Sequence, residues 1–322
     1  MNFQLQNLSI GYDHHMVKRD INISAESGQL ICLIGKNGCG KSTLIRTLSG
    51  YLPMLSGNIL INGKNMRFMS SRQRATQISI VLTESSHSDW LTVDDVVSMG
   101  RIPYSNWTGN LQNNDKIIIE NAIKDANIGD LRYRHIDSLS DGEKERVFIA
   151  KAIAQDTPII LLDEPISHLD IPNRIETLHL LQKLSHQSNK IIIVSIHEIK
   201  LALRYADEIW MIKNDELING IPEDLVINGT MENFFEPLSF DTLNGDYILV
   251  NKNNIGFVNV KGDESINLHW TKLALNRIGF IINKDADCEI YVNLDNWILK
   301  RFGKEKTITS IGDLIKELRQ HR

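Results

Sequence analysis

The chain has 322 residues, of which 42% are hydrophobic, so it is long enough for one large domain and a smaller second one, each with a core. Its formal net charge is −5 and its lysines and arginines form no basic run, which argues against nucleic-acid binding. Its three cysteines form no CxxC pair, its N-terminus has no signal pattern, and no apolar run approaches the roughly 20 residues of a membrane span. We therefore expect a soluble protein of a reducing compartment, without a disulfide framework or zinc site.

The first two thirds of the chain predict a parallel sheet covered by helices. Residues 2–12 alternate apolar and polar side chains, residues 29–35 form a continuous apolar run that ends in glycine, and residues 41–50 have helical spacing. Further strands are expected in GNILING, QISIVLTE, PIILLDEP and KIIIVSIHE, a hairpin in ADEIWMIKNDELING, and helices through residues 93–133 and in NRIETLHLLQKLS. Short Ile- and Val-rich strands that alternate with helices are typical of an α/β fold.

The character of the sequence changes near residue 237. The turn-rich segment EPLSFDTLNGD precedes strand-like runs at YILV and IGFVNV, an amphipathic helix at LHWTKLALNRIGF, a strand at CEIYVNL and a last helix at IGDLIKELRQ. We therefore divide the chain into a large domain of residues 1–236 and a small α/β domain of residues 237–322.

The segment GKNGCGKST, residues 35–43, fits the phosphate-loop pattern G-x-x-x-x-G-K-[ST] and lies between a predicted strand and a predicted helix. Its glycines let backbone N–H groups close around phosphate oxygens, and the helix N-terminus adds partial positive charge. Lys41 is expected to reach the β- and γ-phosphates, and the Ser42 hydroxyl to bind Mg²⁺. The ATP-binding residues expected from this loop are Gly35, Asn37, Gly38, Cys39, Gly40, Lys41, Ser42 and Thr43.

Polar residues follow two further buried strands. Asp163 and Glu164 end PIILLDEP, and His197 ends KIIIVSIHE. Ligands of open α/β sheets bind at the carboxyl edge, where these residues would meet the phosphate loop. Asp163 suits Mg²⁺, directly or through water, and Glu164 is placed to polarise the water that attacks the γ-phosphate, with His197 in contact with that phosphate. Taken alone, either sequence could simply end a strand.

The segment SLSDGEKERV, residues 138–147, has the properties of a second phosphate site. Ser140 is a good helix N-cap, and Gly142 leaves the backbone open. One subunit has no use for a second such site beside a complete phosphate loop. The segment becomes useful if it covers the γ-phosphate held by another copy, so we predict a head-to-tail homodimer with two shared sites.

The order of phosphate loop, LSDGE, LLDEP, SHLD and IH resembles the ATP-binding subunits of ABC transporters over residues 1 to about 235. The resemblance implies a P-loop NTPase fold of the ABC type, with a helical subdomain at about residues 85–155. It also implies that Tyr12 stacks on adenine and that Ser140 and Gly142 act in trans. In the same way Asp170 would link the two sites, and His197 would be the switch histidine.

The segment LTVDDVVSMGRIPY, residues 91–104, is similar to importers of ferric siderophores, haem and cobalamin. The resemblance implies the ATP-hydrolysing subunit of a bacterial importer that uses ATP and Mg²⁺. The partners it implies are a second copy of the chain, membrane permease subunits and, indirectly, a substrate-binding protein. The location it implies is peripheral, on the cytoplasmic face of the cell membrane.

Two parts of the sequence depart from the family pattern. Asp141 and Glu143 stand where the family usually has Gly and often Gln, and Asp141 is expected to face solvent because a carboxylate near phosphate is repelled. The family's Gln after the strand ISIVL aligns with Thr83, and Glu84 is next. We predict that Thr83 reaches Mg²⁺ through a water and that Glu84 approaches it directly, unless this loop serves only as a permease contact.

Alternative functions stay open. A non-transport ABC ATPase of DNA repair or translation is disfavoured, because the roughly 100 residues between the phosphate loop and LSDGE show no heptads and only one ATPase half is present. An importer of another substrate class with a regulatory C-terminal domain is a second alternative. Residues 237–322 could sense a ligand, or could only pack and stabilise the dimer.

Overall fold

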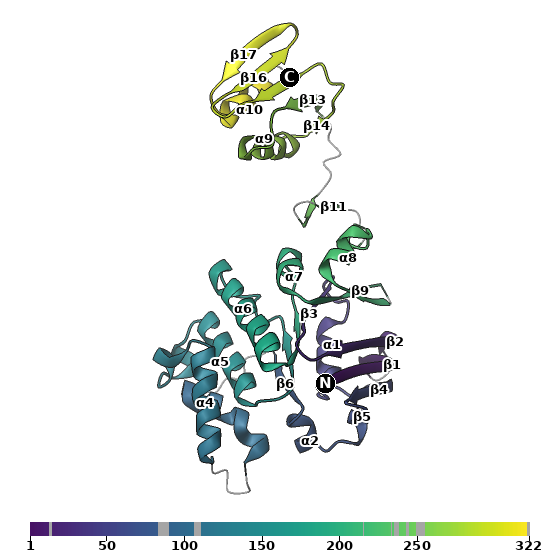
Figure 1. The fold of residues 1–322 in the computed structure, drawn as a ribbon, viewed down its shortest axis with the longest axis vertical. Coiled ribbons are helices and arrows are strands. Elements are labelled where there is room, and N and C mark those ends of the chain that lie inside the picture. The colour runs from purple at the N-terminus through teal and green to yellow at the C-terminus, as the bar shows by residue number, and fades with distance from the viewer. Residues whose placement is uncertain are drawn as a thin grey trace. The chain divides into compact units, whose positions relative to one another are not determined.

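The computed structural model describes residues 1–12, 15–82, 90–105, 111–214, 216–232, 234, 238–242, 245–248 and 255–320. It contains two compact units, and Figure 1 shows the helices and strands of each. The first unit is Met1–Glu236 with Phe240–Tyr247, and the second is Pro237–Ser239 with Ile248–Arg322. The segment Phe240–Tyr247 therefore packs with the first unit, although the boundary drawn from the sequence assigns it to the small domain.

A six-stranded sheet forms the centre of the first unit, with the strand order β10-β9-β3-β8-β7-β6. All of its neighbouring strands run parallel except the β9–β10 hairpin, which confirms the expected α/β arrangement. The strands are β3 Leu30–Gly35, β6 Ile78–Val81, β7 Ile159–Asp163, β8 Ile191–Ser195, β9 Glu208–Lys213 and β10 Glu216–Gly220.

Both faces of this sheet are buried, which explains why its strands are apolar at consecutive positions. In β3, Leu30, Cys32 and Ile34 belong to one hydrophobic core, whereas Ile31 and Leu33 belong to another on the opposite face. Parallel strands covered on both faces have this near-continuous hydrophobic sequence.

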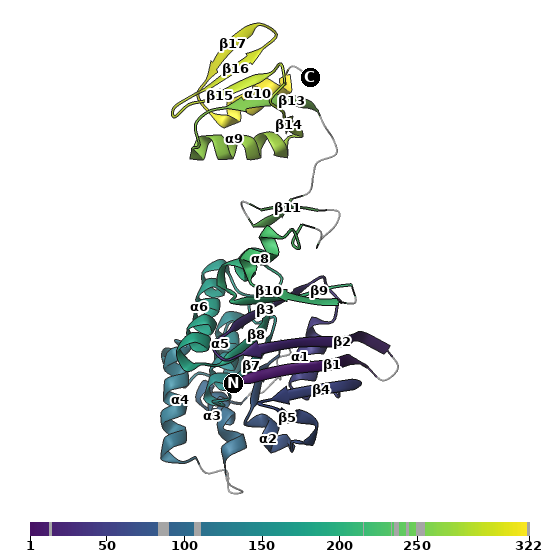
Figure 2. The same cartoon turned by 45° about the vertical axis from the view of Figure 1, so that its right-hand side comes forward.

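A second, antiparallel sheet covers one face, with the strand order β2-β1-β4-β5. Helix α1, Lys41–Leu48, lies between the two sheets and contributes Leu44 and Ile45 to their shared core (Figure 2). Strands β1 and β4 correspond to expected strands, whereas their long partner β2 was not predicted. The strands of this sheet are β1 Asn2–Tyr12, β2 His15–Glu26, β4 Ser56–Ile61 and β5 Lys64–Asn65.

Helices cover the other face of the central sheet. The region expected to be a helical subdomain contains α3, three of the 3-10 helices, α4 and α5, and apolar residues of this region join the core on that face. The longer helices are α4 Asn113–Asp125, α5 Asp141–Ala154 and α6 Ile171–Ser188, and the shorter are α2 Ser71–Ala75, α3 Val93–Ser98, α7 Ile199–Tyr205 and α8 Pro222–Ile227. The 3-10 helices are η1 Met66–Phe68, η2 Met99–Tyr104, η3 Gly129–Leu131 and η4 Ile136–Ser138, and a two-stranded ribbon is formed by β11 Ser239–Asp241 and β12 Asp246–Ile248.

The second unit has its own core beneath a five-stranded sheet of order β14-β13-β15-β16-β17. The expected strands and helices near residues 256, 266, 289 and 311 are present, but the helix over residues 268–280 ends earlier, because Gly279 with φ 93° turns the chain into a short strand. The hairpin of β16 and β17 was not predicted. The elements are β13 Gly256–Lys261, α9 Ile266–Arg277, β14 Phe280–Ile282, β15 Glu289–Val292, β16 Trp297–Arg301, β17 Lys304–Ile308 and α10 Ile311–Gln320.

Across the part of the chain that the structure describes, no helix combines the length and the apolar character needed to cross a membrane.

Candidate functional site

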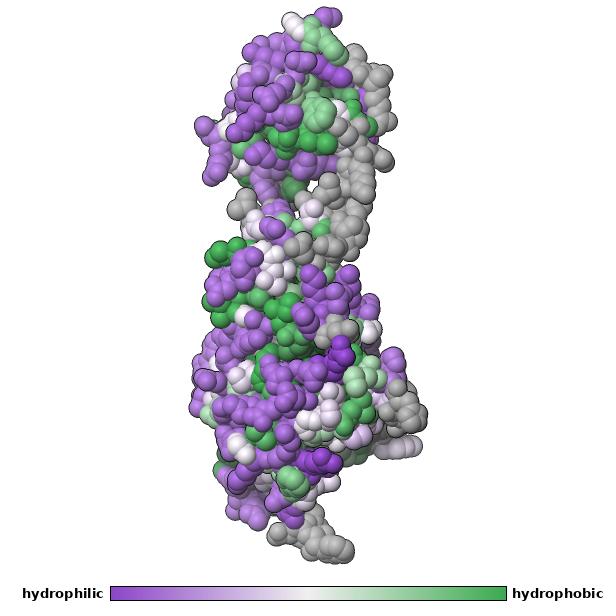
Figure 3. Space-filling model, turned by 90° about the vertical axis from the view of Figure 1, so that its right-hand side faces the viewer, coloured by the Kyte–Doolittle hydropathy of each residue, from purple (hydrophilic) through white to green (hydrophobic). Residues whose placement is uncertain are grey.

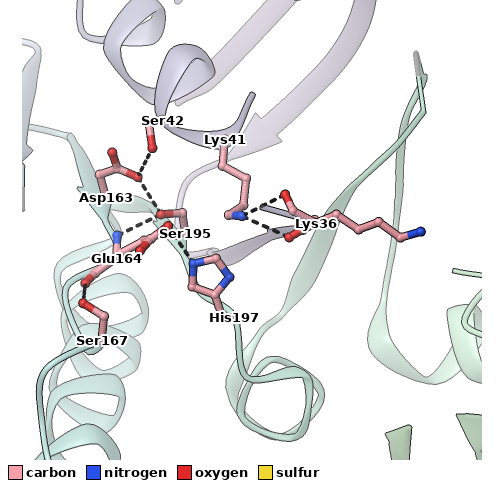
Figure 4. A network of polar contacts seen from close by, with 9 residues as sticks. Lys36, Lys41, Ser42, Asp163, Glu164, Ser167, Ser195 and His197 are labelled. Carbon is pink, nitrogen blue, oxygen red and sulfur yellow. Dashed lines mark hydrogen bonds and ion pairs between the residues drawn. The ribbon is translucent and has the colours of Figure 1, made fainter. Parts of the chain in front are cut away.

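The carboxyl ends of three neighbouring parallel strands bring the predicted catalytic segments together. The phosphate loop follows β3, Asp163 and Glu164 end or follow β7, and His197 follows β8, which lies between those strands. Figure 4 shows their side chains converging. Sites of open α/β sheets form at this edge, as expected from the sequence.

The phosphate loop is held open by its glycines and by a buried lysine. Gly38 and Gly40 have φ angles of 74° and 107°, which non-glycine residues rarely adopt. A Cβ at Gly40 would also lie 2.6 Å from Val17 Cγ1. The Lys41 ammonium donates hydrogen bonds to the carbonyls of Gly35, at 3.0 Å, and Lys36, at 3.4 Å. These bonds hold the lysine stem along the loop, within reach of a phosphate.

Asp163 is the centre of a hydrogen-bond network. Its Oδ1 atom accepts hydrogen bonds from the hydroxyls of Ser42, at 3.2 Å, and Ser195, at 2.8 Å. The Ser195 oxygen in turn accepts the Glu164 backbone N–H at 2.8 Å. Ser195 thus fixes both carboxylate residues, yet sequence reasoning missed it. The available signal was a hydroxyl at the end of the otherwise apolar run IIIVS.

Glu164 and His197 form a direct polar pair. Glu164 has φ 53°, the left-handed region, and His197 Nε2 lies 2.6 Å from its Oε1 atom. Both side chains remain partly exposed. A strained backbone at a polar pair is typical of a functional position.

These residues line a cavity of about 380 Å³. Its wall includes Tyr12, an exposed aromatic residue whose hydroxyl accepts a hydrogen bond from Thr43 at 3.5 Å. His15 and Val17 also line it, and both come from the strand β2 that the sequence did not reveal. The other lining residues are Asn37, Gly38, Gly40, Lys41, Ser42, Thr43, Glu164 and His197. Cys39 and Gly35 do not line it: the Cys39 sulfur would be 2.4 Å from a Cβ at Gly35, so the two pack against each other.

The LSDG segment lies outside this cavity. Ser140 and Glu143 form a reciprocal capping box at the start of α5, and Asp141 is 80% exposed, which confirms that it faces solvent. A Cβ at Gly142 would lie 3.1 Å from Leu169 Cδ2, so LSDG packs directly against SHLD. Asp170 caps α6 by accepting the Asn173 N–H at 3.1 Å. Neither Ser140, Gly142 nor Asp170 lines the cavity of the phosphate loop.

A second, smaller cavity of about 200 Å³ lies between Leu82, the start of α5 and the loop before α6. Glu145 lines it, and burial raises the pKa of its carboxyl to about 8. Its Oε1 atom is buried and has no hydrogen-bond partner among the residues that the structure describes. The predicted magnesium residues Thr83 and Glu84 follow Leu82 but lie outside the described residues.

A Mg²⁺ ion fits the oxygen atoms of Ser42 and Asp163 at the carboxyl edge of the central sheet. The hydroxyl of Ser42 and a carboxylate oxygen of Asp163 already lie in contact, and both are hard ligands of the kind that Mg²⁺ prefers. Within the described residues no cluster of three or more His, Cys, Asp or Glu could hold a metal. Ser42 and Asp163 would supply only some of the ligands of the ion, and Mg²⁺ at nucleotide sites is usually also bound by phosphate and water.

The fold, together with the phosphate loop and the carboxylates at the carboxyl edge of the central sheet, defines a P-loop nucleoside triphosphatase. The profile of the ABC transporter family matches residues 18–167, and that of the iron ABC transporter C-terminal domain matches residues 256–319. An uncharacterized ABC transporter ATP-binding protein of Methanocaldococcus jannaschii, MJ0873, is 39% identical over 69% of this chain and 77% of its own. The probable siderophore transport system ATP-binding protein YusV of Bacillus subtilis is 35% identical over 71% of this chain and 84% of its own.

Solved structures agree on the fold. The dimeric structure of a bacterial ABC transporter cassette, MJ0796, superposes with a TM-score of 0.61 at 22% identity and covers 68% of this chain and 98% of its own. This chain belongs to the ATP-binding proteins of ABC transporters. It binds and hydrolyses ATP, and the family resemblance expected from its motifs is confirmed.

Proposed function

We propose that this protein powers the import of a ferric siderophore through a separate membrane permease. The proposal depends on one combination of features. The ATP cavity is lined by the phosphate loop, Glu164 and His197, and the profile of an iron ABC transporter C-terminal domain matches the second unit. The similarity to YusV, named for siderophore transport, supports iron siderophores ahead of haem or cobalamin.

The roles of the side chains follow from their positions. Lys41 neutralises the β- and γ-phosphates, and Tyr12, at the outer wall of the cavity, stacks on the adenine ring. Glu164 accepts a proton from the attacking water, and its contact with His197 keeps the carboxylate oriented toward the cavity. His197 also contacts the γ-phosphate.

Ser42 and Asp163 would hold the Mg²⁺ that accompanies ATP, because their oxygen atoms are the hard donors at this edge. The ion, when bound, neutralises phosphate charge as it does in other P-loop enzymes. Ser195 keeps Asp163 oriented for this task through its 2.8 Å hydrogen bond.

The active protein is a homodimer whose ATP sites are completed in trans. Ser140 and Gly142 lie outside the cavity of their own chain, so they are available to a γ-phosphate held by the partner. The packing of Gly142 against Leu169 couples this contact to the Asp170 loop. The dimer binds permease subunits at the cytoplasmic face of the membrane, beneath a substrate-binding protein.

The dimer is tested by gel filtration with the Glu164→Gln variant, which retains a side chain of the same size but cannot accept a proton. With ATP we expect a stable dimer and strongly reduced hydrolysis. The matched control carries Lys41→Ala as well, which removes phosphate binding and should leave monomers. A Glu164→Gln protein that stays monomeric at high ATP and protein concentration contradicts the trans site.

The transport role is tested by co-purifying the chain with a candidate permease and reconstituting both in vesicles. Ferric siderophore with its binding protein should stimulate ATP hydrolysis, whereas haem and cobalamin should not. Stimulation by haem or cobalamin alone would overturn the substrate assignment and leave the ATPase assignment intact.

A further inference from the structure

The second unit contains a cavity of about 380 Å³ that the ATPase does not use. It lies where the first residues of β13 and β14, the loop before β15 and the end of β16 meet. Register places Glu289 opposite both Asn259 and Lys300, so Cys288 and Arg301 come together beside β13. Its size is in the range of cavities that bind small organic molecules.

Arg301 lines this cavity and brings a guanidinium group to it. Its Nη1 atom is buried and has no hydrogen-bond partner among the described residues. The guanidinium carbon lies 4.8 Å from the centre of the Phe302 ring, which restricts the side chain. A guanidinium carries five N–H donors, and a carboxylate is the group whose geometry pairs with it best.

Aromatic and aliphatic side chains form part of the remaining wall. Phe280 is buried beneath the cavity, and a Cβ at Gly256 would lie 3.0 Å from its ring, so these walls are in close contact. Ile255, Phe257 and Phe302 line the cavity and expose 37%, 49% and 83% of their surfaces. Figure 3 shows hydrophobic residues, in green, exposed among hydrophilic ones on this unit. Burial also raises the pKa of the Cys288 thiol, an effect that the nearby Arg301 charge reduces, so Cys288 is a neutral part of the wall.

Two acidic residues at the rim restrict the charge of a ligand. Asp285 and Asp287 line the cavity, and both are exposed to solvent. Their carboxylates repel a phosphate or another polyanion more strongly than a single carboxylate. A ligand that carries one negative charge on an apolar body therefore suits the Arg301 cation, the aromatic walls and the acidic rim together.

We propose that this cavity binds a small organic monocarboxylate, with the carboxylate on Arg301 and an apolar, ring-sized body against the aromatic side chains that line it. The site belongs to the second unit alone, so it adds a ligand-binding function to the ATPase chain. It favours the ligand-sensing interpretation of the C-terminal residues over a purely packing role.

Fluorine NMR titrations of the full-length protein test the proposal with para-fluorobenzoate and para-fluorophenylacetate as probes. We expect saturable binding of at least one of them. The uncharged para-fluorobenzamide should bind about tenfold more weakly or worse, because charge-assisted hydrogen bonds are the stronger ones. Absence of saturable binding by both carboxylates, or equal binding of the amide, overturns the proposal.

Two variants locate the binding. Arg301→Gln should weaken carboxylate binding by about tenfold to a hundredfold, whereas Arg277→Gln, an exposed arginine of the same unit, should not change it. Phe257→Ala alters an exposed wall that contributes little to folding, and it should weaken binding about fivefold. If Arg301→Gln fails to fold, Phe257→Ala decides: unchanged binding in a folded variant places the probe elsewhere and overturns the site.

Discussion

At the scale of single residues, Ser195 links the two carboxylates of the ATPase site. Its hydroxyl is fully buried, donates to Asp163 and accepts the Glu164 N–H, both at 2.8 Å. One oxygen atom therefore sets the direction of an expected metal ligand and of the expected base. A residue of this kind positions the reacting groups without touching ATP.

Replacing Ser195 with Ala should reduce ATP hydrolysis about tenfold or more while ATP affinity changes little, because the phosphate loop is intact. The orphaned Glu164 N–H should also cost about 1–3 kcal/mol of stability. Steady-state ATPase rates and nucleotide titrations measure the two effects. The control is Ser167→Ala, which removes an exposed hydroxyl bonded to the Glu164 carbonyl at 3.0 Å and should leave the rate nearly unchanged. Equal rates for the parent and Ser195→Ala would remove this serine from the mechanism.

Glu145 gives the stability a pH dependence. Burial raises its folded-state pKa to about 8, above its unfolded value. Below the unfolded pKa the carboxyl is neutral in both states. As the pH rises toward 8 the unfolded chain releases this proton while the folded chain keeps it, so this contribution to stability is lost across that window.

Glu145→Gln should therefore raise the free energy of unfolding by about 2 kcal/mol near pH 8, with a gain that shrinks toward pH 5. This free energy is smaller than the equivalent of the full pKa shift of Glu145, because the side chain is partly solvated. Urea unfolding at several pH values checks the trend, with the exposed Glu176→Gln of α6 as control. A gain that is the same at every pH would show that Glu145 does not titrate as described.

At the scale of elements, a buried ion pair joins η2 to α4 and α5. Arg101 donates to Asp115 Oδ1 and to the Ala154 carbonyl, each at 2.9 Å, and both charged side chains are less than a tenth exposed. The Tyr104 ring lies 4.0 Å from the guanidinium. The backbone N–H of Gln112 and, to a lesser extent, Arg101 hold the pKa of Asp115 below its usual range. This pair fixes the segment that resembles siderophore, haem and cobalamin importers onto the end of α5.

Asp115→Ala should destabilise the protein by about 3–5 kcal/mol, because it leaves the Arg101 charge buried without its carboxylate. Asp94→Ala is the matched control: it breaks the partly exposed pair with Arg132 and should cost about 1 kcal/mol or less. Urea unfolding of each variant gives both values. Similar losses for the two variants would mean that burial of the Arg101 pair has no special effect.

At the scale of the whole molecule, the chain separates into an ATPase unit and a C-terminal unit with independent cores. Part of the segment that connects them, Phe240–Tyr247, packs with the first unit. Phe240 is buried in the first core, its ring lies 4.9 Å from that of Tyr247, and the Tyr247 hydroxyl donates to the Met231 carbonyl. The catalytic residues proposed here all precede this segment.

A chain of residues 1–248 should fold and bind ATP as tightly as the full-length protein. A chain of residues 1–236 should also bind ATP but be about 3 kcal/mol less stable, because it lacks the Phe240 side chain that closes the first core. Thermal melts and ATP titrations compare the two, and Phe240→Ala in the full chain should reproduce most of the difference. A folded 1–248 chain that fails to bind ATP would make the C-terminal unit part of the site.

The sequence by itself determined the fold class, the family and most of the candidate ATPase site. These depend on local patterns: the phosphate loop between a strand and a helix, and carboxylates or a histidine at the ends of apolar strands. The tertiary structure decided the rest. Ser195 meets Asp163 only because β8 pairs with β7. His15 and Val17 reach the ATP cavity only through β2, whose regular alternation is confined to its second half and does not include them. Likewise, Arg301 and Cys288 become neighbours through strand register, because pairing across a sheet depends on the packing of the whole unit rather than on nearby residues.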